Sequence, residues 1–196
     1  MSEPVVVDLF AEDAAHESFL KTMLMRLARQ AGKTIALQTR SARGGHPHAL
    51  KELGIYQKVA LKAMDLPTLL VVAIDANCKR FATAKGEIEK RLETPFKERA
   101  LIACPDPHIE RWYLADPQSF FKVVGTQPSS GKRKCERERY KKILSHAVTS
   151  AGHPPTLGGI EFASEIVEAM DLYRAGRAEP SLKDFLNQIT ARLRSI

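Results

Sequence analysis

Long hydrophobic runs, paired cysteines and nucleotide-binding motifs are missing from this 196-residue sequence. The longest apolar stretch, residues 66–74, is far shorter than the roughly 20 residues that a membrane-spanning helix needs, so no membrane association is expected. The first residues lack a basic region followed by a cleavage site, so no secretory signal is expected either. These absences favour a cytoplasmic protein.

The three cysteines, Cys78, Cys104 and Cys135, are an odd number and contain no CxxC pair. This pattern argues against both a disulfide framework and a structural zinc site. Cys78 and Cys104 are instead expected to pack as small buried hydrophobic residues. Because the sequence also lacks a Walker A motif, any ATPase activity would have to come from another chain.

Positive charge, by contrast, is in excess. The chain has 30 Lys and Arg residues against 23 Asp and Glu residues, a formal net charge of +7. Such a surplus suits a polyanionic partner, of which nucleic acid is the commonest, although many basic enzymes act on other substrates. A hydrophobic content of 44% and a length of 196 residues fit one globular domain with a good core.

Short apolar segments alternate with amphipathic segments along the first part of the chain. Strands are predicted over residues 4–10, 34–39, 68–74 and 99–104, and helices over residues 14–30, 50–64, 80–92 and 108–114. This alternation predicts an α/β fold whose mostly parallel four-stranded sheet is flanked by helices. We assign residues 1–115 to this core.

The pattern changes beyond residue 115. Helices are predicted over residues 140–150, 160–173 and 181–193, separated by linkers with Gly and Pro at 152–155 and 176–180. We therefore predict that residues 116–196 form a C-terminal helical extension packed on the core.

Acidic residues follow the predicted strands. Glu12 comes after the first strand, Asp75 and Asn77 after the third, and Glu110 after the fourth. Ligands of parallel sheets bind at the carboxyl ends of the strands, and Mg²⁺ prefers carboxylate and other hard oxygen ligands. The sequence therefore predicts a site for Mg²⁺ or Mn²⁺ with Glu12, Asp75 and Asn77 as ligands.

Other acidic residues near strand ends have a simpler explanation. Asp13 and Asp106 are expected to be helix N-caps, where the helix dipole favours negative charge. For Glu17 and Glu110 two roles are left open: each could be an acid that stabilises the first turn of a helix, or each could be a catalytic residue.

Three segments of the chain together resemble one protein family. They are LFAEDAAHESFL, starting at Leu9, VVAIDANC, ending at Cys78, and ACPDPHIERWYLAD, ending at Asp116. The chain resembles the Toprim superfamily, and within it the small stand-alone proteins related to the overcoming-lysogenization-defect nucleases and to abortive-infection proteins. The resemblance covers residues 4–125.

This resemblance implies a Toprim-like fold and a metal-dependent nuclease acting on DNA or RNA. The family carries a glutamate after its first strand, matched by Glu12, and an Asp-x-Asp pair after its third, whose first member matches Asp75. A later carboxylate of the nuclease branch matches Glu17 or Glu110, which makes these four the implied catalytic residues. The relatives also imply a role in phage defence and a separately encoded partner, an ATPase of the ABC or SMC type.

Two positions depart from the family pattern. Asn77 replaces the second aspartate and removes a charge, which lowers the expected metal affinity. Asp13 stands where a glycine often follows the glutamate. One alternative is therefore a catalytically degenerate Toprim-fold subunit with a binding or regulatory role. Another is a receiver-like phosphoacceptor domain built on Glu12, Asp13 and Asp75, although no fifth strand with a lysine is visible.

Basic residues gather in two segments near the predicted site. They are Arg40 and Arg43, in a glycine-containing loop after the second strand, and Lys132, Arg133 and Lys134, at the start of the densest basic tract. Both segments are candidate contacts to a nucleic-acid backbone. Because Glu136 and Glu138 interrupt the tract, a solvated helix start explains it equally well.

Four of the six histidines, His16, His46, His48 and His108, also lie near predicted strand ends. No HxxxH or HExxH spacing marks them as metal ligands, so a ligand role is not expected of them. His108 could instead orient a carboxylate or a phosphate. The substrate and the formation of a homo-oligomer are left open.

Overall fold

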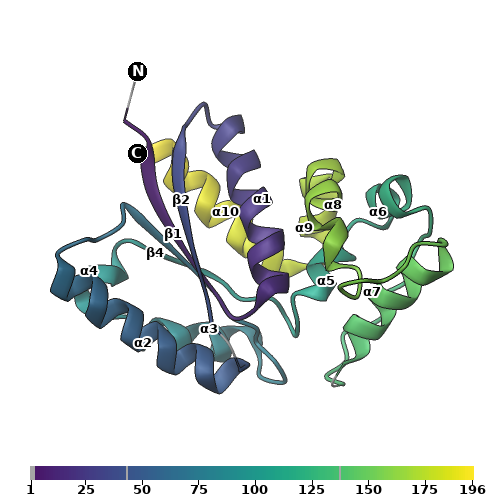
Figure 1. Cartoon of the computed structure of the whole chain (residues 1–196), viewed down its shortest axis with the longest axis horizontal. Coiled ribbons are helices and arrows are strands. Elements are labelled where there is room, and N and C mark those ends of the chain that lie inside the picture. Colours follow the sequence, from purple (N-terminus) through teal and green to yellow (C-terminus); the bar gives the residue numbers. More distant parts are fainter. Residues whose placement is uncertain (1–2, 43, 137) are drawn as a thin grey trace.

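Figure 1 shows the computed structural model of the chain, which describes residues 3–42, 44–136 and 138–196. Strands β1 (Val5–Ala11), β2 (Ile35–Ser41), β3 (Leu69–Ala73) and β4 (Ala100–Ala103) pair in parallel, in the order β2-β1-β3-β4. The predicted fold class, an α/β protein with a four-stranded parallel sheet, flanking helices and a helical C-terminal part, is confirmed for these residues.

Helices cover both faces of the sheet (Figure 1). Helices α1 (Ala14–Gln30) and α10 (Pro180–Ser195) lie on one face, and α2 (His46–Ala63), α3 (Phe81–Glu89) and α4 (Thr94–Lys97) lie on the other. Side chains of β3 alternate between these two layers: Leu69 and Val71 pack with α1, whereas Leu70 and Val72 pack with α2 and α3. Burial on both faces explains why this strand is apolar throughout.

Helix α1 has the limits that the sequence predicts. Its buried residues recur every three or four positions, as in Phe19, Met23 and Leu27. Asp13 is its N-cap, as expected, because the carboxylate accepts hydrogen bonds from the backbone N–H groups of Ala15 and His16. The start of α1 is therefore fixed directly after β1.

The helical segment, residues 116–196, packs beside α1 and the sheet. The short helix α5 (Glu110–Tyr113) leads into this segment, which contains α6 (Pro117–Val124), α7 (Arg139–Ser150), the 3-10 turn η1 (Ile160–Phe162), α8 (Ala163–Ala169), α9 (Leu172–Ala178) and α10. One hydrophobic cluster joins residues of α1, β3 and α5 to residues of α8 and α10. The division of the chain near residue 116 stays a prediction.

Several predicted limits are wrong. The predicted start of the second helix at residue 50 is too late, because α2 already starts at His46, after Gly45 at φ 78° and with Pro47 in the first turn. Residues 160–173 do not form one helix, because the chain is extended at Met170. The expected linker at 176–180 is mostly helical, as α9 continues to Ala178.

Cys78 and Cys135 form a disulfide bond, contrary to the prediction. Their Cα atoms are 5.3 Å apart although 57 positions separate them in the sequence. Cys104 is buried and free, as expected of it. Counting cysteines missed the pair because an odd total does not prevent two distant cysteines from meeting. In the described residues, no helix combines the length and apolarity needed to cross a membrane.

Candidate metal centre

Glu12 and Asp75 lie next to each other at the carboxyl edge of the sheet. Ala11 of β1 and Ala73 of β3 are partners in the parallel ladder, so the chain segments that follow these two strands leave the sheet side by side. The backbone N–H of Asp75 donates a hydrogen bond to Oε2 of Glu12 at 3.0 Å, and both side chains are buried. The structure thus brings together the two carboxylates that the sequence places after separate strands.

His16 joins this pair from the first turn of α1. Its ring is completely buried, with Nε2 3.0 Å from Oδ1 of Asp75 and Nδ1 2.8 Å from Oδ1 of Asp13. One ligand atom each from Glu12, His16 and Asp75 lies within 4.8 Å of the other two. This buried group could hold a metal ion.

Two more histidines approach the carboxylates. His46, at the start of α2, has its Nδ1 3.8 Å from Oε2 of Glu12. That nitrogen is buried and has no hydrogen-bond partner among the described residues. His108 has its Nδ1 3.1 Å from Oδ2 of Asp75. Imidazoles from three separate segments therefore surround the Glu12 and Asp75 pair.

These groups open into a cavity of about 610 Å³, which we call the metal-site cavity. Its lining residues are Glu12, Asp13, Gly45, His46, Pro47, Asp75, Asn77, His108, Glu110, Glu138, Tyr140 and Lys141. Asn77 has a left-handed backbone with φ 54°, a conformation that asparagine tolerates well. The ends of two strands and the starts of α2, α5 and α7 therefore all contribute to this cavity.

The opposite charges of His16 and Asp75 shift the pKa of each other. Burial opposes ionisation of His16, but the charge of Asp75 and the hydrogen bonds to Asp13 and Asp75 raise the pKa of His16 well above its usual 6.5. Burial likewise opposes ionisation of Asp75, yet the charge of His16 and the hydrogen bond from His108 lower the Asp75 pKa. Protonated His16 thus supplies the positive charge that keeps the buried carboxylate of Asp75 ionised.

Glu110, on α5, faces the same cavity and is almost fully buried. Burial and the negative charge of Asp75 raise its pKa to about 7. A group with such a pKa exchanges protons readily at neutral pH, which is the property of general acids and bases.

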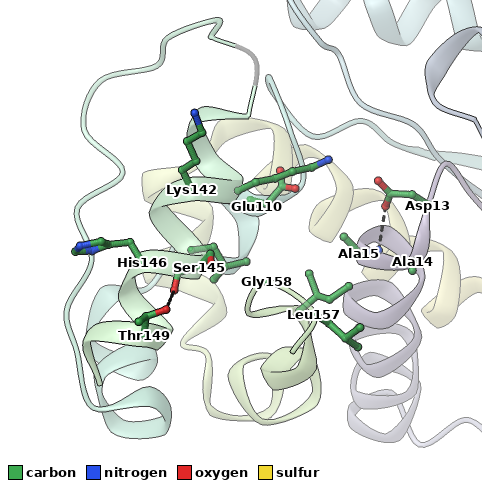
Figure 2. A pocket seen from close by; sticks show the side chains of 13 residues that line it. Asp13, Ala14, Ala15, Glu110, Lys142, Ser145, His146, Thr149, Leu157 and Gly158 are labelled. Atoms are coloured by element: carbon green, nitrogen blue, oxygen red, sulfur yellow. Dashed lines mark hydrogen bonds between the residues drawn. The ribbon is translucent and has the colours of Figure 1, made fainter. Parts of the chain in front are cut away.

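A second cavity of about 660 Å³ adjoins the first, and we call it the side cavity (Figure 2). Asp13, Glu110 and Lys141 line both cavities. Ala14 and Ala15 of α1 and Leu144, Leu157 and Ile160 supply apolar surface to the side cavity. Figure 2 shows α1 and α7 on opposite sides of it, with Glu110 between them. The metal-site cavity, lined mainly by polar side chains, is thus adjoined by a largely apolar one.

Other residues singled out from the sequence lie elsewhere. Glu17 turns toward β2, where the hydroxyl groups of Thr39 (3.0 Å) and Ser41 donate to its carboxylate. Arg40 lines a different cavity of about 740 Å³, which also contains Asp8 and Tyr56. The structure therefore does not bring Glu17 or Arg40 to the metal-site cavity.

The basic residues before α7 differ in their contacts, and two of them lie beside carboxylates. Lys132 is exposed, and Lys134 has its Nζ 3.8 Å from a carboxylate oxygen of Glu136. Arg133 donates to Oδ1 of Asp106 at 2.6 Å, so Asp106 pairs with arginine and is not the N-cap that the sequence predicts. Arg43 lies outside the described residues.

Sequence reasoning suggested that His108 orients a carboxylate, and its contact with Asp75 agrees, but it did not expect His16 and His46 beside the carboxylates. His16 follows Glu12 by four residues at a helix start, and this proximity to a predicted ligand was the available signal. His46 could not be found in this way, because its place depends on the start of α2.

Fold and site together define an α/β protein with an acidic, histidine-containing pocket at the carboxyl edge of a parallel sheet. Comparisons of this chain with protein-family models, with curated proteins and with solved structures found no match.

Proposed function

We propose that the protein is a metal-dependent phosphodiesterase that cleaves DNA or RNA. The observation that carries this proposal is the meeting of Glu12 and Asp75, buried beside His16, at the floor of an open cavity. Carboxylates gathered at the carboxyl edge of a parallel sheet are suited to bind a divalent cation.

Glu12 and Asp75 would hold the ion, and Asn77 offers a neutral oxygen at the rim of the same cavity. Mg²⁺ or Mn²⁺ is the ion that the carboxylates suit. Once bound, such an ion polarises a phosphodiester and lowers the pKa of an attacking water. Glu110 is placed to exchange a proton with the reacting oxygens, and its raised pKa suits that task.

The two adjoining cavities suit a nucleotide. A phosphate in the metal-site cavity would lie near Lys141, which lines both cavities. The attached nucleoside would extend into the side cavity, whose aliphatic walls can enclose a base. The net charge of +7 favours association with a polyanion.

The resemblance to Toprim proteins adds a biological setting. The stretches around Glu12, Asp75 and Glu110 resemble those of nucleases that work in phage defence with an ABC- or SMC-type ATPase. We extend the proposal to an effector of this kind, with the ATPase supplied by a separate chain.

The test is nuclease activity in Mg²⁺ and in Mn²⁺, with plasmid, single-stranded DNA and tRNA as substrates. Glu12→Gln and Asp75→Asn should each reduce cleavage at least about 100-fold, because each removes a charged ligand from the ion. Glu168→Gln is the matched control, since its carboxylate pairs with Arg29 on the exposed surface of α8. Undiminished cleavage by both site variants would reject the proposal.

A second candidate function is a binding or regulatory subunit without catalysis. Two observations favour it: Asn77 carries no charge, and protonated His16 already supplies a positive charge between the carboxylates of Asp13 and Asp75. Calorimetry separates the two functions. Absence of heat from millimolar Mg²⁺ or Mn²⁺, together with tight binding of a macromolecular partner, would favour the regulatory subunit.

A further inference from the structure

We propose that the bound ion displaces the Nε2 proton of His16 to solvent and takes the neutral imidazole as a direct ligand, so that the site prefers a transition metal of the Zn²⁺ class over Mg²⁺. This inference rests on the proposed function, because it concerns the ion that the same site would use. It departs from the oxygen-only site that the sequence predicts.

The first argument is the fixed orientation of the His16 ring. Nδ1 contacts Oδ1 of Asp13 at 2.8 Å, and that carboxylate is itself held by the N–H groups of Ala15 and His16. Nε2 consequently points at the carboxylate pair. A histidine whose outer nitrogen contacts a carboxylate while its inner nitrogen faces the ion is the usual arrangement in protein metal sites.

The second argument is the spacing of the donor atoms. Ligand atoms around a Zn²⁺ ion, at about 2.0–2.2 Å from it, are roughly 3–4 Å from one another. The donor atoms of Glu12, His16 and Asp75 lie within 4.8 Å of one another before any ion is present. To reach the spacing found around Zn²⁺, these donor atoms have to move about an ångström closer together, which rotations of their side chains allow.

The third argument is the buried nitrogen of His46. A buried polar atom without a hydrogen-bond partner is unfavourable, so a partner is expected for it. Nδ1 of His46 lies 3.8 Å from Oε2 of Glu12, the separation of two ligands that share one ion. His46 is therefore the candidate fourth ligand, whereas His108 orients Asp75 from the other oxygen.

These donors select among ions. Imidazole nitrogen suits Zn²⁺ and its neighbours, and it suits Mg²⁺ poorly because that ion prefers six oxygen ligands. Asn77, which replaces a charge with an amide, weakens the site for Mg²⁺ further. Two carboxylates with one or two imidazoles still match the needs of Zn²⁺, and Mn²⁺ is expected to bind with intermediate affinity.

Metal binding to the chelator-stripped full chain tests this inference without any activity assay. X-ray absorption of the Zn²⁺-loaded wild-type protein should show the multiple scattering of coordinated imidazole. His16→Gln should weaken Zn²⁺ binding at least about 100-fold, and Asp13→Asn by about 10–100-fold as an outer partner, while Mg²⁺ affinity changes less than about threefold. Circular dichroism checks that the variants fold.

His48→Gln is the matched control, because His48 is exposed on α2 in the turn that carries His46. A metal shell made only of oxygen, or equal Zn²⁺ affinities of the His16 and His48 variants, would overturn the inference. Imidazole ligation without cleavage would defeat only the proposed function, and cleavage at an all-oxygen site would defeat only this inference.

Discussion

At the residue scale, Glu110 couples the site to the stability of the protein. Burial and the charge of Asp75 raise its pKa from 4.5 to about 7. Between these two pH values the folded state holds a proton that the unfolded chain has released, so the free energy of unfolding falls as the pH rises. The destabilisation caused by the buried negative charge of Glu110 is therefore complete only above the pKa of Glu110 in the folded state.

Glu110→Gln should remove this loss. In the presence of a chelator, the variant should be more stable than the wild type by about 3 kcal/mol at pH 8, and the difference should shrink to below about 1 kcal/mol at pH 5. Urea denaturation followed by circular dichroism at several pH values measures this difference. A difference that does not change with pH would show that Glu110 ionises as it does in the unfolded chain.

At the element scale, the disulfide ties the loop after β3 to the basic tract before α7. Asn77 and Glu138 line the metal-site cavity; Cys78 directly follows Asn77 in the sequence, and Cys135 precedes Glu138 by three residues. A crosslink that closes a loop of this length is worth about 4 kcal/mol through the entropy of the unfolded chain. We expect oxidised protein to lose about this much stability on reduction, as measured by urea denaturation.

Thiol counting in denaturant checks the bond itself. The oxidised wild-type chain should give one reactive thiol, that of Cys104, and Cys135→Ser should give two. The Cys135→Ser variant also serves as the control for the stability measurement, because a reductant should not change its unfolding. Three thiols in the wild type, after purification without reductant, would contradict the pairing.

The elements that the sequence predicts correctly are those set by local patterns. The limits of α1 follow from a regular apolar repeat and the Asp13 cap, and β3 follows from an apolar run of strand length. The break before α9 depends on both local and distant contacts. The carboxylate of Asp171 caps α9 by accepting from the N–H groups of Tyr173 and Arg174, which is a local signal. The N–H of Asp171 also donates to Oδ2 of Asp116 at 2.8 Å, 55 residues away, and no local pattern contains that contact.

The same distinction applies to the candidate site. Glu12 and Asp75 could be placed together from the sequence because parallel strands end at one edge. His46 could not, since it reaches Glu12 only through the start of α2 at Gly45, which has φ 78°. The disulfide partner of Cys78 was hidden for a similar reason, as Cys135 is 57 positions away in the sequence and no local pattern links the two.

At the scale of the whole molecule, a buried ion pair connects the sheet part to the last helix. The guanidinium of Arg111, on α5, donates to both carboxylate oxygens of Glu179, at the start of α10, with Nε at 2.9 and 3.0 Å. It also donates to the hydroxyl of Tyr140 at 3.1 Å. Next to it, the indole N–H of Trp112 donates to the hydroxyl of Ser181 at 2.9 Å. These contacts join α5 to residues that lie 29 to 69 positions later in the sequence.

Removing one member of this pair should destabilise the whole molecule. Glu179→Ala leaves the charge of Arg111 buried without its partner, so we expect a loss of about 3–5 kcal/mol in a single urea transition. Glu168→Ala, which breaks the exposed pair with Arg29, should cost less than about 1 kcal/mol. The double variant Arg111→Met with Glu179→Leu should recover most of the loss, because it removes both charges together. Two results would contradict this expectation: a loss of stability in Glu179→Ala as small as that in Glu168→Ala, or unfolding of Glu179→Ala in two separate transitions. Either would show that α10 is not part of the cooperative core. The position of α5, whose Glu110 lines the metal-site cavity, would then not depend on this ion pair.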